Sequence, residues 1–79
     1  MNKQLIRAEI AKLLDLPLSA ITDELLISEE GGWDSIVTVS FIAFLITECD
    51  CRMEIDELMA IPTVGDLWEV IETKVGVVQ

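Results

Sequence analysis

The segment SIVTVSFIAFLITE, from Ser35 to Glu48, most restricts what this chain can fold into. It is almost wholly apolar and follows EGGWD, where two glycines interrupt the preceding chain and Asp34 is a favourable N-cap. Its valines, isoleucines and phenylalanines also suit a strand, but its length and capped start favour a helix. A helix this apolar is normally buried or used for binding, so we expect it at the centre of a small helical domain.

Two faces of this predicted helix are apolar. The face expected to enter the core carries Phe41, Leu45 and Cys49, with Thr38 and Phe44 beside them. The second face carries Ile36, Val39, Ile42, Ala43 and Ile46. Because the chain has only 79 residues, it cannot bury both faces completely.

Three further helices and one long loop are predicted in the rest of the chain. Apolar residues at helical spacing predict a first helix over residues 3–14, which Pro17 prevents from continuing. A short helix is expected near Asp56 to Ala60, and PTVGDLWEVIETKV predicts a last helix with Thr63 and Asp66 at capping-box spacing. The stretch from Leu18 to Trp33 is predicted to be a long loop held on the core, with one possible helical turn in ITDELL. These elements make an all-α bundle of three longer helices and one short helix, in a single domain spanning residues 1–79.

Composition and charge narrow the class of protein. Fifteen acidic residues against five basic ones give a net charge of -10, which disfavours nucleic-acid binding and favours basic protein partners, although solubility alone explains part of it. No apolar run approaches the roughly 18 residues of a membrane span, and the N-terminus is not a signal peptide, so a cytoplasmic location is expected. Cys49 and Cys51 are expected to be free thiols.

Ser35 is the residue whose chemistry needs explaining. The chain has no histidine, so a hydrolytic serine lacks its usual base, and no residue set suits a metal site. A phosphate ester on Ser35 would, however, meet the free N–H groups and positive dipole of a helix start. The alternative, that Ser35 is only a helix-starting residue, is equally compatible with these observations.

The sequence GGWDSIVTVSFIAFL resembles the Asp-Ser-Leu prosthetic-group motif of acyl carrier proteins, with Ile36 in place of leucine. MEIDELMAIPTVGDLWEVIE is similar to their third helix and the start of their fourth. The likeness covers nearly the whole chain. It implies that Ser35 carries 4'-phosphopantetheine, which a phosphopantetheinyl transferase transfers from coenzyme A, and that Asp34 helps this transferase dock and position its magnesium.

The resemblance also implies a role without catalysis. The thiol of the arm would hold an acyl, aminoacyl or glyceryl-type unit as a thioester for loading and transfer enzymes, and a monomer is expected. An acyl chain would be sheltered against Phe41, Leu45 and Ile61. A tryptophan directly before the motif, as Trp33 is here, is often seen in carriers of specialised pathways. A structural role, in which Trp33 is a hydrophobic plug for the loop, is equally compatible with the sequence.

One departure from the family concerns the second helix. Fatty-acid carriers usually line it with acids, whereas here the matching positions hold Val37, Ser40, Ile46 and Thr47. This favours a specialised lipid, polyketide or related pathway over primary fatty-acid synthesis. The partner-binding residues predicted from this pattern are Ile36, Val37, Val39, Ile42 and Ile61. The competing interpretation is a carrier-like helical interaction domain that is never modified and binds a partner through the apolar helix.

Overall fold

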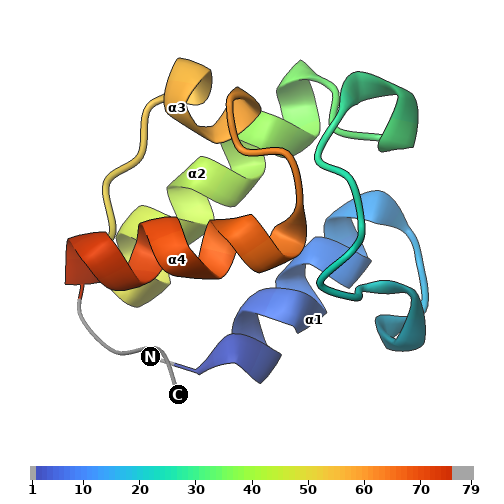
Figure 1. The fold of residues 1–79 in the computed structure, drawn as a ribbon, viewed down its shortest axis with the longest axis horizontal. Coiled ribbons are helices and arrows are strands. Elements are labelled where there is room, and N and C mark those ends of the chain that lie inside the picture. Colours follow the sequence, from blue (N-terminus) through green and yellow to red (C-terminus); the bar gives the residue numbers. More distant parts are fainter. Residues whose placement is uncertain (1, 76–79) are drawn as a thin grey trace.

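A computed structural model describes residues 2–75 of the chain, and within them the expected all-α bundle is confirmed. The ends of the predicted domain, residue 1 and residues 76–79, lie outside the described residues. The elements are α1 (Lys3–Leu14), η1 (Leu18–Ala20), η2 (Glu29–Gly31), α2 (Ser35–Cys49), α3 (Ile55–Met59) and α4 (Val64–Val75), where η marks a 3-10 helix. Figure 1 shows α4 crossing in front of α2, with α1 below this pair and α3 above it. No helix within residues 2–75 is long and apolar enough to cross a membrane.

Helix α1 has the predicted bounds because both of its ends are capped. The side chain of Asn2 accepts a hydrogen bond from the Gln4 N–H, at 2.8 Å, and this satisfies one free donor of the first turn. Asp15 ends the helix in the left-handed conformation, with φ 56°, and Pro17 follows. The face toward the core consists of Ile6, Ile10 and Ala11.

Helix α2 runs one residue past the predicted end, to Cys49, where Asp50 takes a left-handed conformation with φ 50°. The predicted core face is confirmed for Thr38, Phe41 and Leu45, which are buried, while Phe44 and Cys49 are half-buried against the core. On the second face, Ile36, Val39 and Ile46 are exposed, while Ile42 is half-buried against the core. The helix therefore buries one apolar face and leaves most of the other in solvent.

The two last helices also lie close to their predicted positions. Helix α3 begins at Ile55, one residue early, and ends at Met59, with Leu58 as its buried residue. Before α4, the hydroxyl of Thr63 accepts from the Asp66 N–H and donates to the Asp66 carboxylate, at 3.2 and 2.9 Å. The predicted pairing of these two residues is confirmed. It differs from a full capping box in that the Asp66 carboxylate accepts from the Thr63 hydroxyl and not from the Thr63 backbone N–H. Helix α4 buries Val64, Leu67, Trp68 and Ile71.

The long loop is more ordered than predicted, because it contains η1 and η2 and is pinned to the residues before α4. The Ile27 N–H donates to the Pro62 carbonyl and the Val64 N–H to the Leu25 carbonyl, both at 3.0 Å. Ile21 and Ile27 are buried, as expected of a loop held on the core. Leu18 and Leu26 are exposed, so not every apolar side chain of the loop reaches the core. The possible helical turn in ITDELL is a simple turn, closed by the Leu25 N–H donating to the Thr22 carbonyl.

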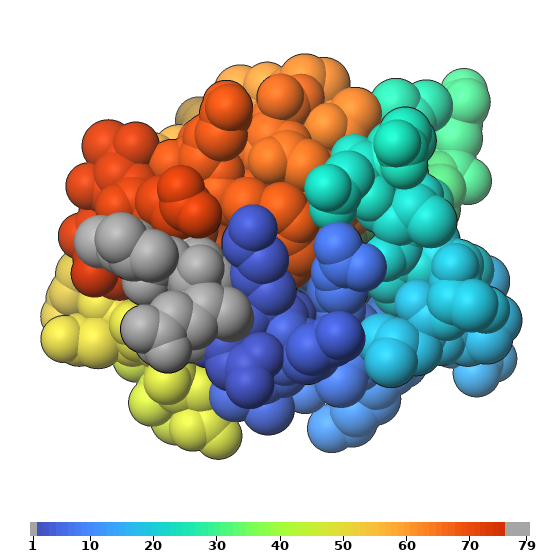
Figure 2. Space-filling model, turned by 60° about the horizontal axis from the view of Figure 1, so that its bottom comes forward, coloured from blue at the N-terminus to red at the C-terminus, as the bar shows by residue number. Residues whose placement is uncertain are grey.

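Asp23 ties this part of the loop to two helices, α1 and α4. Its carboxylate accepts from Arg7 at 2.9 Å and from the indole N–H of Trp68 at 3.1 Å, and its carbonyl accepts from the Gly65 N–H at 2.8 Å. Lys3 and Arg7 also lie over the Trp68 ring, 5.7 and 5.8 Å from its centroid. Figure 2 shows side chains of α1 reaching the surface of α4 beside the loop.

We expect Asp23→Ala to lower the free energy of unfolding by about 1–3 kcal/mol, because the largely buried Trp68 loses the acceptor of its indole N–H. The exposed ion pair with Arg7 adds little to this loss. Urea denaturation of both proteins gives the difference. Glu24→Ala is the matched control, since it removes the neighbouring exposed carboxylate. Equal stabilities of the two variants would show that the bonds to Asp23 do not support the fold.

Candidate functional site

The candidate site lies where η2 meets the start of α2. Gly32 ends η2 with φ 100°, a conformation that favours glycine, and its carbonyl accepts from the Asp34 N–H at 2.9 Å. Asp34 is extended, and its carboxylate accepts from the Val37 N–H at 2.9 Å. The predicted N-cap is confirmed. This cap fixes the point at which the chain becomes helical, so Ser35 is the first residue of α2.

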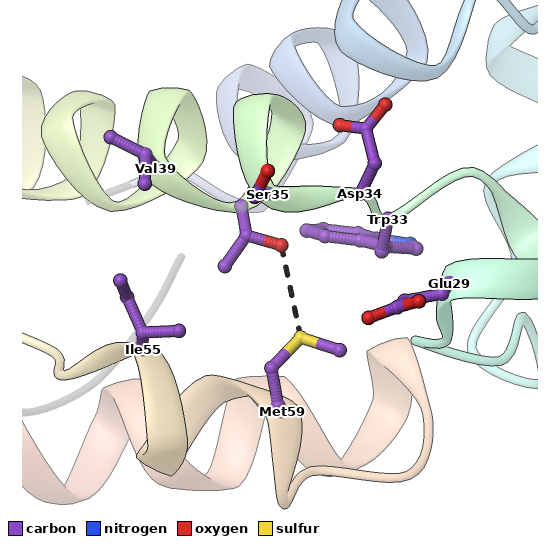
Figure 3. Close-up of a pocket in the computed structure, with 8 residues that line it drawn as sticks. Glu29, Trp33, Asp34, Ser35, Val39, Ile55 and Met59 are labelled. Atoms are coloured by element: carbon purple, nitrogen blue, oxygen red, sulfur yellow. Dashed lines mark hydrogen bonds between the residues drawn. The ribbon is translucent and has the colours of Figure 1, made fainter.

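Ser35 is exposed, and its hydroxyl points away from α3, as does the Asp34 carboxylate (Figure 3). Within residues 2–75, no hydrogen bond engages the Ser35 hydroxyl or the N–H groups of Ser35 and Ile36. These free donors and the helix dipole favour a negatively charged group at this position. The hydroxyl is thus accessible for modification by another enzyme, and a phosphate ester attached there meets a favourable electrostatic environment.

Trp33 lies behind this exposed serine and anchors the start of α2 to the core. Its side chain is 1% exposed and meets Phe41 edge to face, with ring centroids 5.4 Å apart. Phe41 in turn stacks on Phe44, at 6.2 Å. The indole N–H of Trp33 has no hydrogen-bond partner within residues 2–75. The ring therefore fills the space under the loop, which fits the plug role considered from the sequence.

A pocket of about 120 Å³ opens between α2 and α3 beside Ser35 (Figure 3). One wall comes from the start of α2, the opposite wall from α3, and one end from η2. Its floor is closed by the Thr38 hydroxyl, which lies 3.7 Å from the sulfur of Met59. The lining residues are Glu29, Trp33, Asp34, Ser35, Thr38, Val39, Ile55 and Met59. Its walls are thus mainly apolar, with the carboxylate-bearing Glu29 at the end formed by η2 and no basic residue among those that line it.

The structure separates the other predicted site residues into two groups. Ile36 and Val39 are 76% and 52% exposed on α2, so they are available to a partner. Val37 and Ile42 are half-buried against the core, and Ile61 is 5% exposed. Phe41 and Leu45, expected beside an acyl chain, are fully buried and do not line the pocket next to Ser35.

Cys49 and Cys51 are free thiols near the other end of α2, far along the helix from Ser35. Burial raises the pKa of both thiols, and the neighbouring Cys51 raises the pKa of Cys49 further. Raised pKa values keep both groups protonated at neutral pH, where a thiol is a poor nucleophile. Among residues 2–75, no three side chains of histidine, cysteine, aspartate or glutamate gather into a metal-binding group.

Comparison with known families identifies the class of protein that this arrangement serves. The profile of the family described as "Phosphopantetheine attachment site" matches residues 4–71. The chain therefore belongs to this family of carrier domains, and the resemblance to acyl carrier proteins is confirmed. A search of curated proteins finds no match to this chain.

Domains of this family carry a covalently attached 4'-phosphopantetheine, so the predicted cofactor is also confirmed. They interact with phosphopantetheinyl transferases and acyl-handling enzymes, and they are not themselves catalytic. The start of α2 fits such a group on structural grounds as well. It offers an exposed hydroxyl that has no hydrogen-bond partner among the residues the structure describes, free N–H donors for a phosphate and an adjoining pocket.

Sequence reasoning missed the residues that form the far side of the pocket. Glu29, Ile55 and Met59 line it, although none of them was singled out beforehand. Met59 and Ile55 look like ordinary residues of a short helix, and only the packing of α3 against α2 brings them opposite Ser35. Glu29 carries no sequence signal, because acidic residues are common throughout this chain.

We expect Asp34→Ala to lower the free energy of unfolding by about 1 kcal/mol, because the Val37 N–H loses its acceptor. Asp34→Asn should change stability much less, since asparagine is an equally good N-cap. Thermal and urea unfolding of the two variants beside the parent protein measures the difference. If both variants lost the same stability, the charge of Asp34, and not its hydrogen bond, would be the stabilising feature.

Proposed function

We propose that this protein is an acyl carrier whose 4'-phosphopantetheine is attached to Ser35. The observation that carries this proposal is the position of Ser35. It is an exposed hydroxyl without a hydrogen-bond partner among the described residues, on the first residue of a capped helix, in a chain of the phosphopantetheine-attachment family. When bound, the group supplies a thiol that holds the cargo as a thioester. The protein delivers this cargo to partner enzymes at high effective concentration.

Attachment requires only that Ser35 act as an acceptor. A phosphopantetheinyl transferase binds coenzyme A and the folded carrier. The bond between the Ser35 oxygen and phosphorus forms as the pyrophosphate bond of coenzyme A breaks and adenosine bisphosphate leaves. The serine proton passes to a base of the transferase, since the residues around Ser35 include no histidine or lysine. Asp34 contributes transferase recognition through its outward-pointing carboxylate.

The surface of α2 supports a specialised pathway in place of primary fatty-acid synthesis. From Ser35 to Thr47 the helix carries no charged residue, while Asp34 lies at one end and Glu48 and Asp50 at the other. We propose that partner enzymes contact the exposed residues Ile36 and Val39 through an apolar surface flanked by basic side chains. This charge pattern distinguishes the partners from enzymes that bind an acidic helix.

Incubation with coenzyme A, magnesium and a broad-specificity phosphopantetheinyl transferase should add one phosphopantetheinyl group to the protein. Intact-protein mass spectrometry measures the gain, and fragmentation locates it on Ser35. Ser35→Ala should gain nothing, because it lacks the acceptor oxygen. Ser40→Ala, which removes a hydroxyl elsewhere on α2, should be modified like the parent protein.

Asp34→Asn extends this experiment to recognition, since it retains an N-cap while removing the charge. We expect at least a tenfold slower modification of this variant at unchanged stability. Modification of Ser35→Ala, or no modification of folded parent protein by several transferases, would contradict the proposed attachment site. The second outcome would favour an unmodified interaction domain that uses the exposed face of α2.

The partner surface is tested by removing apolar side chains that the fold does not need. Val39→Ser and Ile36→Ser should each lower kcat/KM of the transferase for the carrier about tenfold, mainly through KM, because an apolar contact contributes about 1.4 kcal/mol or more at a hot spot. Leu5→Ser on α1 is the matched control, as Leu5 is 50% exposed and Val39 52%. If kcat/KM were the same for all three variants, the partner surface would lie elsewhere.

A further inference from the structure

Three aromatic side chains, Trp33, Phe41 and Phe44, form a row inside the bundle that we call the aromatic row. Trp33 and Phe41 are buried and meet edge to face, and Phe41 stacks on the half-buried Phe44. We propose that this row keeps the cargo outside the helices, which suits the carrier to a short or polar acyl unit and not to a long alkyl chain. The inference rests on the proposed attachment of the arm to Ser35.

The aromatic row begins where a chain tethered to Ser35 would have to enter the core. Trp33 lines the pocket beside Ser35 (Figure 3), while its neighbour Phe41 does not. The Thr38 hydroxyl and the Met59 sulfur, 3.7 Å apart, close the floor of the same pocket. The pocket therefore ends at side chains and does not continue into the core.

A second hollow adjoins Ser35 but stays on the outside of α2. Its lining residues are Ser35, Ile36, Val39 and Ser40. Because all four belong to one helix, this hollow is a depression in the surface of α2 and not an entrance between helices. Neither of the two hollows leads inward.

The space that is left is too small for a long chain. The pocket volume of about 120 Å³ is below the roughly 150 Å³ of an apolar cavity that holds benzene. In the core itself, the side chains of Leu45, Leu58 and Ile71 are fully buried. An octanoyl chain is larger than benzene, so it would have to displace some of these side chains from a closely packed interior.

An exchange of the aromatic row for a chain would bring little gain. An alkyl chain that entered would remove its own apolar surface from water. The displaced Trp33 would, however, expose a large apolar surface of its own and lose its contact with Phe41. The closed arrangement is therefore favoured whether the arm is empty or loaded.

Exclusion from the core determines which cargo suits this carrier. A long alkyl chain left in water exposes its apolar surface, and it would compete with partner enzymes for the exposed Ile36 and Val39. A short or polar unit, such as a hydroxyacyl or aminoacyl group, has neither disadvantage. Its thioester is accessible to a partner enzyme without prior release from the core.

Cargoes of different length test the exclusion directly. A broad-specificity transferase attaches the loaded arm from butyryl- or octanoyl-coenzyme A, and intact mass follows cleavage of the thioester by hydroxylamine. We expect the two carriers to react within about twofold of each other, because an exposed thioester needs no local opening of the fold. Cleavage of the octanoyl carrier at least about fivefold slower would show that its chain enters the core, and would overturn the inference.

A variant that shortens the aromatic row gives the matched contrast. Trp33→Leu removes the ring without removing a hydrogen bond, since its indole N–H has no partner within residues 2–75. In this variant an octanoyl cargo should slow cleavage at least about fivefold and raise Tm above that of the butyryl form, because the chain now binds the folded state. Phe44→Ala opens the same row and replaces Trp33→Leu if the latter does not fold.

Trp68→Leu is the control, since Trp68 is the other largely buried tryptophan and does not line the pocket. It should lower Tm equally with either cargo and leave the two cleavage rates alike. Protection of the octanoyl thioester in both tryptophan variants, or in neither, would overturn the role of the aromatic row.

Intact mass is recorded before cleavage for every sample. Lack of the arm on the parent protein would refute the proposed attachment and this inference with it. An arm that is present, with its octanoyl thioester protected in the parent protein, would refute the exclusion of cargo alone.

Discussion

Burial of one face of α2 is the constraint on which the rest of the structure depends. Phe41 and Leu45 on that face are fully buried, and each of the other α-helices contributes residues to the same core. These core residues include Ile6 and Ile10 of α1, Leu58 of α3, and Leu67 and Ile71 of α4. Because this face is fixed, the position of Ser35 is fixed as well, at the exposed start of the same helix.

The sequence predicted most helix bounds, since these depend on local signals. Pro17 marks the end of α1, the Asp34 cap marks the start of α2, and Thr63 with Asp66 marks the start of α4. The conformation of the loop was not predictable in the same way. It depends on Asp23, whose partners Arg7 and Trp68 are 16 and 45 residues away in the chain. No local pattern indicates contacts between such distant residues.

The candidate site was predictable only on the side built from α2. Asp34 and Ser35 follow from motif and capping, but the opposite wall of the pocket depends on how α3 packs. Burial also depends on packing, which explains why Ile61 lies in the core although it was predicted at a partner surface. Likewise, the position of Leu26 gave no indication that its side chain would be 61% exposed.

The two protonated cysteines have a practical consequence for experiments on this protein. Cys51 is buried and Cys49 half-buried, both thiols have raised pKa values, and their position near the far end of α2 separates them from Ser35. A pantetheine thiol at the end of a mobile arm lacks such protection and ionises near its ordinary pKa. Thiol-directed dyes and crosslinkers should therefore label the prosthetic group selectively in the native chain, so binding partners can be trapped without engineering away Cys49 or Cys51.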